Sequence, residues 1–153
     1  MNGRSVSFTV PGDPIPQPRA RTRVCGAFAT TYTPDNGIRP YKSAIQLAAA
    51  VAGAARLHGT VVVVTVEAVF VRPPSHFLAS GKVRKGAPPI PMRADWDNLA
   101  KGVCDAIFGD DRYISEGRCR KRYAQPGETA HTRVTITEDP DHAPAVTDAA
   151  VNV

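Results

Sequence analysis

Apolar and polar side chains alternate in several short stretches, and this period of two is typical of β-strands with one buried face. Residues 5–10, 61–71, 117–124 and 130–138 are therefore predicted strands, and residues 28–33 form a further candidate strand. In the second of these stretches every even position is apolar. We expect that face to lie in the core, and it consists of Val62, Val64, Val66, Ala68 and Phe70.

Two other stretches predict helices. Residues 41–57 are rich in alanine and lack proline, and Gly59 follows as a stop signal. Residues 97–108 carry an apolar stripe at helical spacing and are followed by Gly109. The stripe consists of Leu99, Val103, Ala106 and Ile107. The resulting order β-β-α-β-α-β-β favours a single small α+β domain with two main helices.

Two segments lack any such period. Residues 72–94 contain several prolines and a basic centre, and a loop of this length inside a compact domain is usually functional or disordered. After residue 138 the chain becomes a mixture of Asp, Pro, Ala and Val. We therefore expect a folded domain over residues 1–138 and an acidic, disordered tail over residues 139–153.

The 153-residue chain has a formal net charge of +5, and its basic surplus lies in the first part of the sequence. Residues 1–125 carry 18 basic and 9 acidic side chains, whereas residues 126–153 carry 1 basic and 5 acidic side chains. A basic body indicates a polyanionic partner, either nucleic acid or an anionic membrane surface. No stretch approaches the roughly 20 apolar residues that span a bilayer, so a membrane span is not expected.

The cysteines do not indicate a disulfide framework or a zinc site. Cys25, Cys104 and Cys119 are odd in number and show no CxxC spacing, so we expect them to be packing residues. Reduced thiols and the absence of an apolar signal-peptide core near the N-terminus fit a cytoplasmic protein.

The segment 95–111 concentrates aspartates around the second predicted helix. Asp95 and Asp97 lie two residues apart at its start, and Asp110-Asp111 directly follow its end, where a turn would return them toward the same point. Lys101 lies one turn after Asp97 on the polar face. Clustered carboxylates without His or Cys favour a hard cation such as Mg²⁺, which next to a basic surface suits phosphodiester hydrolysis.

A purely structural interpretation of the same residues remains open at this point. Asp97 is also a good helix N-cap, and Asp97, Lys101 and Asp105 would form a solvated ion-pair row. Asp110-Asp111 would form only a turn. A cap explains neither Asp95 nor the flanking aspartate pair. Trp96 either packs beneath the site or stacks on a base.

The pattern Asp-x-Asp-Asn-Leu-x-Lys at 95–101, followed by Asp105-Ala106 and Asp110-Asp111, resembles the RusA family of Holliday junction resolvases. The likeness extends over residues 5–138. It includes Val10-Pro11-Gly12, the Pro- and Arg-rich arm after it, Tyr32-Thr33-Pro34, and Arg120-Lys121-Arg122-Tyr123. The resemblance implies a RusA-like fold with a mixed β-sheet. It also implies a Mg²⁺-dependent endonuclease of the kind common in phages and prophages.

The resemblance also implies roles for particular residues. Asp95, Asp97 and Asp111 would bind Mg²⁺, with Mn²⁺ as a substitute, and Lys101 would support catalysis. Asp110 is an alternative to its neighbour Asp111, and Asp105 would have a structural or supporting role. Resolution of a four-way junction needs paired cuts, so a homodimer with two active sites is expected.

Basic side chains in extended segments predict a phosphate-binding surface. Alternate arginines in an extended chain lie roughly 6–7 Å apart on one side, close to the phosphate spacing of a DNA strand. The predicted DNA-binding residues are Arg19, Arg21, Arg23, Lys82, Arg84, Lys85, Arg93, Arg118, Arg120 and Arg122.

The sequence thus favours a Mg²⁺-dependent endodeoxyribonuclease that resolves four-way DNA in recombination and repair. Two alternatives stay open. One is a non-catalytic nucleic-acid binding module in which the acidic cluster is structural. The other is a nuclease for flaps or replication forks, which would use the same residues.

Overall fold

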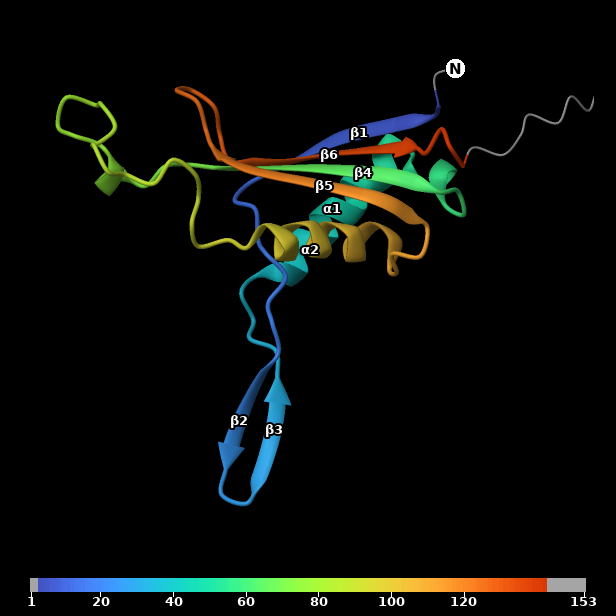
Figure 1. Ribbon diagram of the computed structural model, residues 1–153, viewed down its shortest axis with the longest axis horizontal. Helices are drawn as coiled ribbons and strands as arrows, with labels where there is room; N and C mark the ends of the chain where they lie inside the picture. The colour runs from blue at the N-terminus through green and yellow to red at the C-terminus, as the bar shows by residue number, and fades with distance from the viewer. Residues whose placement is uncertain (1–2, 143–153) are drawn as a thin grey trace, which may run out of the picture.

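The computed structural model describes residues 3–142, which form one α+β domain (Figure 1). Residues 143–153 of the predicted tail lie outside the described part. The strands are β1 Ser5–Pro11, β2 Arg21–Cys25, β3 Phe28–Tyr32, β4 Val62–Phe70, β5 Ile114–Tyr123 and β6 His131–Glu138. The helices are α1 Ile38–Ala52 and α2 Trp96–Phe108, with short 3₁₀ turns η1 Ala54–Leu57 and η2 Pro74–His76.

Four strands form a mixed sheet, as the resemblance implied, and their order in it is β1-β6-β4-β5. β4 and β5 are parallel, because the connection through α2 returns the chain to the end of the sheet at which β4 begins. In contrast, β6 runs antiparallel to both β1 and β4. Both helices lie on the same side of this sheet in Figure 1. The candidate site residues at the start of α2 therefore lie on the helix-bearing side of the sheet.

The hydrophobic core lies between this face and the two helices. Val62, Val64 and Val66 are at most 1% exposed and pack with Ile45 of α1 and Val103 of α2. The predicted core face of β4 is thus confirmed. Each fully buried side chain of this size contributes about 1.5–3 kcal/mol to the free energy of folding.

The first helix begins earlier and ends earlier than the predicted range of 41–57. Pro40 is compatible with helix at the first turn, so the helix extends back to Ile38. Gly53 adopts a left-handed conformation at φ 82° and ends the helix. The next residues, Ala54–Leu57, form a separate 3₁₀ turn.

A β-hairpin that the sequence pattern showed only in part projects from the body (Figure 1). Residues 28–33 were predicted as one possible strand, and the structure pairs that strand, β3, with an additional strand, β2. Every residue of both strands is exposed, including Phe28 at 78%. Without a buried face the arginine-rich strand β2 has no apolar alternation that would reveal it.

The cysteines fall into two groups. Cys104 and Cys119 pack against the core as expected, and burial raises the pKa of each thiol to about 11. Both thiols are therefore protonated at neutral pH and are poor nucleophiles. Cys25 lies exposed on the hairpin, so its predicted packing role is wrong.

The chain stays attached to the sheet just past the predicted domain boundary. The Asp139 backbone N–H donates to the Val61 carbonyl at 2.9 Å, and the Ser115 hydroxyl donates to the Asp139 carboxylate at 2.5 Å. These hydrogen bonds lower the pKa of Asp139.

Candidate active site

The start of α2 presents two carboxylates side by side. Asp95 is the N-cap residue, with extended backbone angles (φ −70°, ψ 130°), and its side chain makes no capping hydrogen bond. Asp97 lies in the first helical turn. Both side chains are exposed, at 61% and 55%. Since neither carboxylate caps the helix, the carboxylate oxygens of both residues are available to bind a cation.

Arg19 holds the position between these carboxylates. Its Nη2 atom lies 3.5 Å from Asp95 Oδ2 and 3.6 Å from Asp97 Oδ2. The two carboxylate oxygens therefore face a common point at which a positive group already lies. Sequence reasoning assigned Arg19 only to DNA phosphates and missed this contact.

Local structure explains how Arg19 reaches α2. Residues 12–20 run as an extended, proline-rich arm from β1 to the hairpin. The Gln17 backbone N–H donates to the Asn98 carbonyl at 2.9 Å, which fixes the arm across the start of α2. Arg19 follows two residues later, beside the carboxylates.

Three further side chains fix the start of the helix. The Asn98 amide donates to Asp95 Oδ2 at 3.4 Å, and Leu99, which is 1% exposed, anchors the first turn in a small apolar cluster. Lys121 of β5 donates from Nζ to the Ala94 carbonyl at 2.5 Å. Asn98 and Lys121 belong to the motifs quoted for the resemblance, but no local pattern identified these positioning contacts.

Lys101 lies one turn along the same exposed helix face. Its Nζ atom is 3.4 Å from Asp105 Oδ2, and the lysine side chain is 62% exposed. Asp105 is therefore an ion-pair partner of Lys101, and the supporting role expected for it stays a prediction. The pair leaves the ammonium group in solvent, next to the turn that bears Asp97.

The two halves of the predicted metal site lie at opposite ends of α2 (Figure 1). The helix has 13 residues, so its ends are about 20 Å apart. Asp110, beyond the far end, pairs with Arg112 at 3.2 Å. Within residues 3–142 no three His, Cys, Asp or Glu side chains gather closely enough to hold a metal ion. The chain by itself therefore does not bring Asp111 to Asp95 and Asp97.

Trp96 does not pack beneath the site. Its side chain is 59% exposed, so the expectation of a buried tryptophan is wrong. The indole lies between the two aspartates in sequence and faces solvent at the start of α2.

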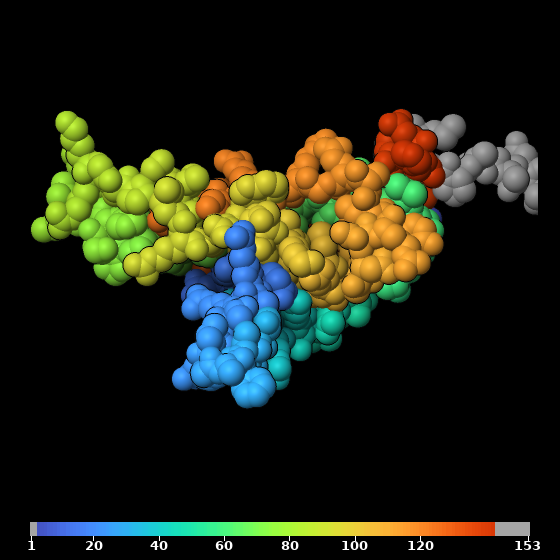
Figure 2. Space-filling view, turned by 60° about the horizontal axis from the view of Figure 1, so that its bottom comes forward, coloured from blue at the N-terminus to red at the C-terminus, as the bar shows by residue number. Residues whose placement is uncertain are grey.

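The predicted DNA-binding residues lie in several places rather than on one surface. Arg21 and Arg23 are exposed on the projecting hairpin, and Arg93 is exposed just before α2. In Figure 2 the blue hairpin projects toward the viewer, and Figure 1 shows from the side that it extends away from the start of this helix. Lys82, Arg84 and Lys85 are exposed on the loop after β4, which is closed by the Phe77–Val83 bridge.

The arginines of β5 lie on the sheet face away from the helices, since the alternate residue Cys119 packs against the core. Arg118 and Arg120 are exposed there. Arg122 is only 21% exposed and donates to both Glu67 and Glu128, which raises its pKa. Arg122 is thus held between two carboxylates in a partly buried contact, whereas Arg118 makes only an exposed pair with Glu116.

Comparison with known protein families identifies the family of this chain. The family model described as Endodeoxyribonuclease RusA matches residues 11–137. The chain belongs to the RusA endodeoxyribonuclease family. The RusA match includes the Asp95–Asp97 pair, Lys101, Asp111 and both arginine segments. No curated protein matches the chain.

Membership in the RusA family identifies the fold as that of a DNA-cleaving enzyme and confirms the resemblance seen in the sequence. Among residues 3–142, no helix combines the length and apolar character needed to cross a membrane.

Proposed function

We propose that this protein is a metal-dependent endodeoxyribonuclease that resolves four-way DNA junctions by paired phosphodiester hydrolysis. The observation that carries the proposal is the convergence of Asp95 and Asp97 on one cationic group at the start of α2. Family membership supports the DNA-cleaving part of the proposal. A merely capping role accounts poorly for these two carboxylates, since the Asp95 side chain caps no amide.

The donor set fits a hard divalent cation. Both groups are carboxylates, and Arg19 Nη2 lies within 3.6 Å of an oxygen from each, so one cation already contacts both. Asp95, Asp97 and a third carboxylate, Asp111, would hold Mg²⁺, with Mn²⁺ as a substitute. When bound, the metal would lower the pKa of a water molecule and neutralise charge on the phosphate. Asp110 is the alternative third ligand.

Lys101 and Arg19 supply the positive groups for the substrate. Lys101 exchanges its exposed partner Asp105 for the phosphate that is cut, which costs little because exposed ion pairs are weak. Arg19 leaves the carboxylates when the metal binds and contacts a neighbouring phosphate. These two residues would then orient the scissile phosphate from opposite sides of Asp97.

A symmetric dimer would complete the site. Because Asp111 follows the far end of α2 and does not join Asp95 and Asp97 in one cluster within the described residues of one chain, we propose that Asp111 comes from a second copy. Each dimer would then hold two composite sites, as paired cuts require. Such an arrangement would tie cutting to dimer formation.

The exposed basic residues would grip the DNA arms without reading sequence. Arg21 and Arg23 follow Arg19, which contacts the carboxylates, by two and four residues, whereas the β5 arginines face away from the helices. We therefore expect the hairpin to contact DNA close to the cut, with more distant arms reaching Lys82, Arg84 and Lys85.

A panel of synthetic DNAs tests this function. The protein is incubated with a four-way junction, a flap and a plain duplex, each with Mg²⁺ or with chelator. We expect paired, symmetric nicks in the junction only with Mg²⁺. Faster cutting of the flap would favour the flap or fork nuclease. Junction binding without cutting under any divalent metal would contradict the proposal and favour a binding module.

A further inference from the structure

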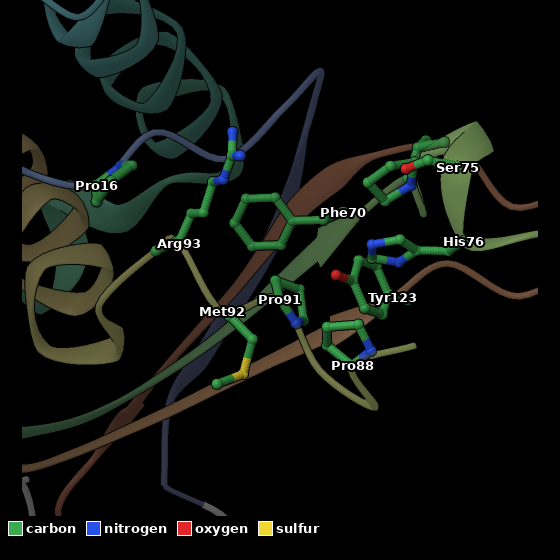
Figure 3. Close-up of a pocket in the computed structure, with 12 residues that line it drawn as sticks. Pro16, Phe70, Ser75, His76, Pro88, Pro91, Met92, Arg93 and Tyr123 are labelled. Carbon is green, nitrogen blue, oxygen red and sulfur yellow. The ribbon is translucent and has the colours of Figure 1, made fainter. Parts of the chain in front are cut away.

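A cavity of about 510 Å³, within the usual size range of ligand sites, lies beside the candidate active site and is not used by the chemistry described above (Figure 3). The loop after β4 and the segment before α2 enclose it. Its walls include Phe70, Tyr123, Pro16, Pro73, Pro88 and Pro91.

The cavity is held open by contacts behind its walls. The Arg72 guanidinium stacks on the Tyr123 ring at 4.1 Å from the ring centroid and donates to the Pro88 carbonyl at 2.8 Å. The His76 ring meets the same tyrosine edge-on, at 5.9 Å between centroids and 89° between planes. Because prolines and braced rings move little, this space exists before any ligand arrives.

The chemistry of the walls suits a flat, polar-edged ring. Phe70 and Tyr123 offer aromatic surface, and Figure 3 shows the Tyr123 hydroxyl pointing toward the space between Phe70 and Pro91. The Arg93 side chain extends past the Phe70 ring in the same view. His76 Nδ1 is enclosed and has no hydrogen-bond partner within residues 3–142. Aromatic surfaces with a few donors and acceptors are how proteins hold unstacked nucleobases.

The cavity adjoins the cutting site through the chain itself. Arg93 and Ala94 line it, and Asp95 is the next residue. Two residues of chain span at most about 7 Å, which is comparable to one nucleotide of an extended strand. A strand whose phosphate lies at Asp95 and Asp97 would therefore carry a neighbouring base to the cavity mouth.

We propose that this cavity takes one unstacked nucleobase of the strand that is cut, and so fixes the strand relative to Asp95 and Asp97. The proposal rests on the proposed nuclease function, since it names part of that substrate's binding site. At a branch point the continuous stack of a duplex is interrupted, and bases that are unpaired or weakly stacked cost least to displace. The cavity would therefore favour branched DNA over continuous duplex.

An abasic scan tests the proposal. A single abasic residue is introduced at successive positions around the cut in a four-way junction, and single-turnover cutting with Mg²⁺ is measured. We expect an abasic residue at one position to lower cutting about tenfold, the size expected for loss of one base–aromatic stack. Ser75→Trp, which fills the cavity from its exposed rim, should lower cutting of the intact junction similarly and abolish sensitivity to that abasic residue.

Two further variants separate base binding from a general loss of structure. Leu78→Trp places the same indole side chain on the same loop, at a 44% exposed residue outside the cavity lining, and should behave as the wild type. Tyr123→Phe keeps the ring under Arg72 and removes only the hydroxyl, so it should lower cutting of the intact junction severalfold and leave the abasic junction unchanged.

The outcomes distinguish this proposal from the proposed function. A flat abasic scan on a junction that is cut, or unchanged abasic sensitivity in folded Ser75→Trp, would overturn the base-binding cavity alone. Failure of the wild type to cut any intact junction would contradict the proposed function, and the base-binding proposal would fall with it.

Discussion

Arg19 connects two segments that lie far apart in the sequence, the proline-rich arm and the start of α2. Its guanidinium contacts both Asp95 and Asp97, each at about the distance expected for an exposed ion pair. In the absence of metal this arginine limits repulsion between the two carboxylates. The same contact makes it a competitor for any cation that binds there.

Arg19→Ala should therefore tighten metal binding by the free protein. Removing a like charge close to the site is expected to strengthen Mn²⁺ binding about threefold to tenfold in the absence of DNA. Titration calorimetry measures this change, with Arg21→Ala on the same arm as the matched control. Unchanged or weaker Mn²⁺ binding by Arg19→Ala would show that the metal does not bind at this carboxylate pair.

The site residues differ in whether local spacing along the chain is enough to identify them. Asp95, Asp97 and Lys101 could be selected because their spacing along one helix start follows from local geometry. The Arg19 contact could not, since 76 positions separate it from Asp95 and no local period encodes it. Lys121 was visible only as one cation among several, although it fixes the residue before Asp95.

The packing of helix α2 determines which of its side chains face the candidate site. Its apolar stripe was predictable, and the structure buries Leu99, Val103 and Ala106 as expected. The same stripe orients Asp97 and Lys101 toward solvent. The turn after the helix was not visible in the sequence, so the expected return of Asp110-Asp111 toward the helix start was not borne out within one chain.

Leu99→Ala should destabilise the domain strongly. Truncation of a leucine that is 1% exposed is expected to lower the free energy of unfolding by roughly 2–5 kcal/mol, because it leaves a cavity under the first turn of α2. Leu47→Ala makes the same change at a 68% exposed position of α1 and should cost less than about 0.5 kcal/mol. Urea unfolding compares the two, and equal losses would contradict the observed packing.

The strand β5 contains a pH-dependent contact. Arg122 donates to both oxygens of Glu128, at 2.5 and 2.8 Å, and this contact lowers the pKa of Glu128 to about 2. A carboxylate whose pKa is lowered by folding stabilises the fold above its unfolded value of 4.5. That contribution is lost as the pH falls from about 4.5 toward 2.

Glu128→Gln should flatten this part of the stability profile. We expect the unfolding temperature of the wild type to approach that of the variant as the pH falls through this window, since both then lack the charged pair. Thermal unfolding from pH 7 to pH 2.5 measures the difference. Glu116→Gln, in an exposed pair with Arg118, serves as control and should give a smaller difference at every pH. Parallel wild-type and Glu128→Gln curves would contradict the role assigned to this contact.

At the scale of the whole molecule, the predicted fold was largely correct because a buried face leaves a periodic signal. The strands of the main sheet were found by alternation, and β4 revealed its core face directly. The hairpin was found only in part because all ten of its strand residues are exposed. Strand order could not be predicted, since pairing depends on contacts such as Val6 with Ile136 that no local pattern records.

Because Asp111 and Asp97 lie apart within one chain, mixing two inactive variants tests whether two copies share each site. If each site takes Asp97 from one copy and Asp111 from the other, a mixture of Asp97→Asn and Asp111→Asn proteins contains dimers with one intact site. Refolding the two inactive variants together should therefore restore single-strand nicking of a junction. Either variant alone should remain inactive.

The same mixing experiment has a clear opposite result. If both aspartates act within one chain, every site in the mixed dimer carries one substitution, and no nicking returns. That outcome would contradict the composite site and require Asp111 to reach the start of α2 by a rearrangement of the turn after it.

The most direct test of the whole account measures cutting and binding of a four-way junction by one variant. Asp97→Asn removes a carboxylate charge from the start of α2 while keeping the side chain's size. We expect cutting with Mg²⁺ to be abolished, while junction binding is preserved or tightened because repulsion of the phosphates falls. Asp13→Asn, which removes the same charge from an exposed loop position, should cut normally. Normal cutting by Asp97→Asn would contradict the assignment of the active site.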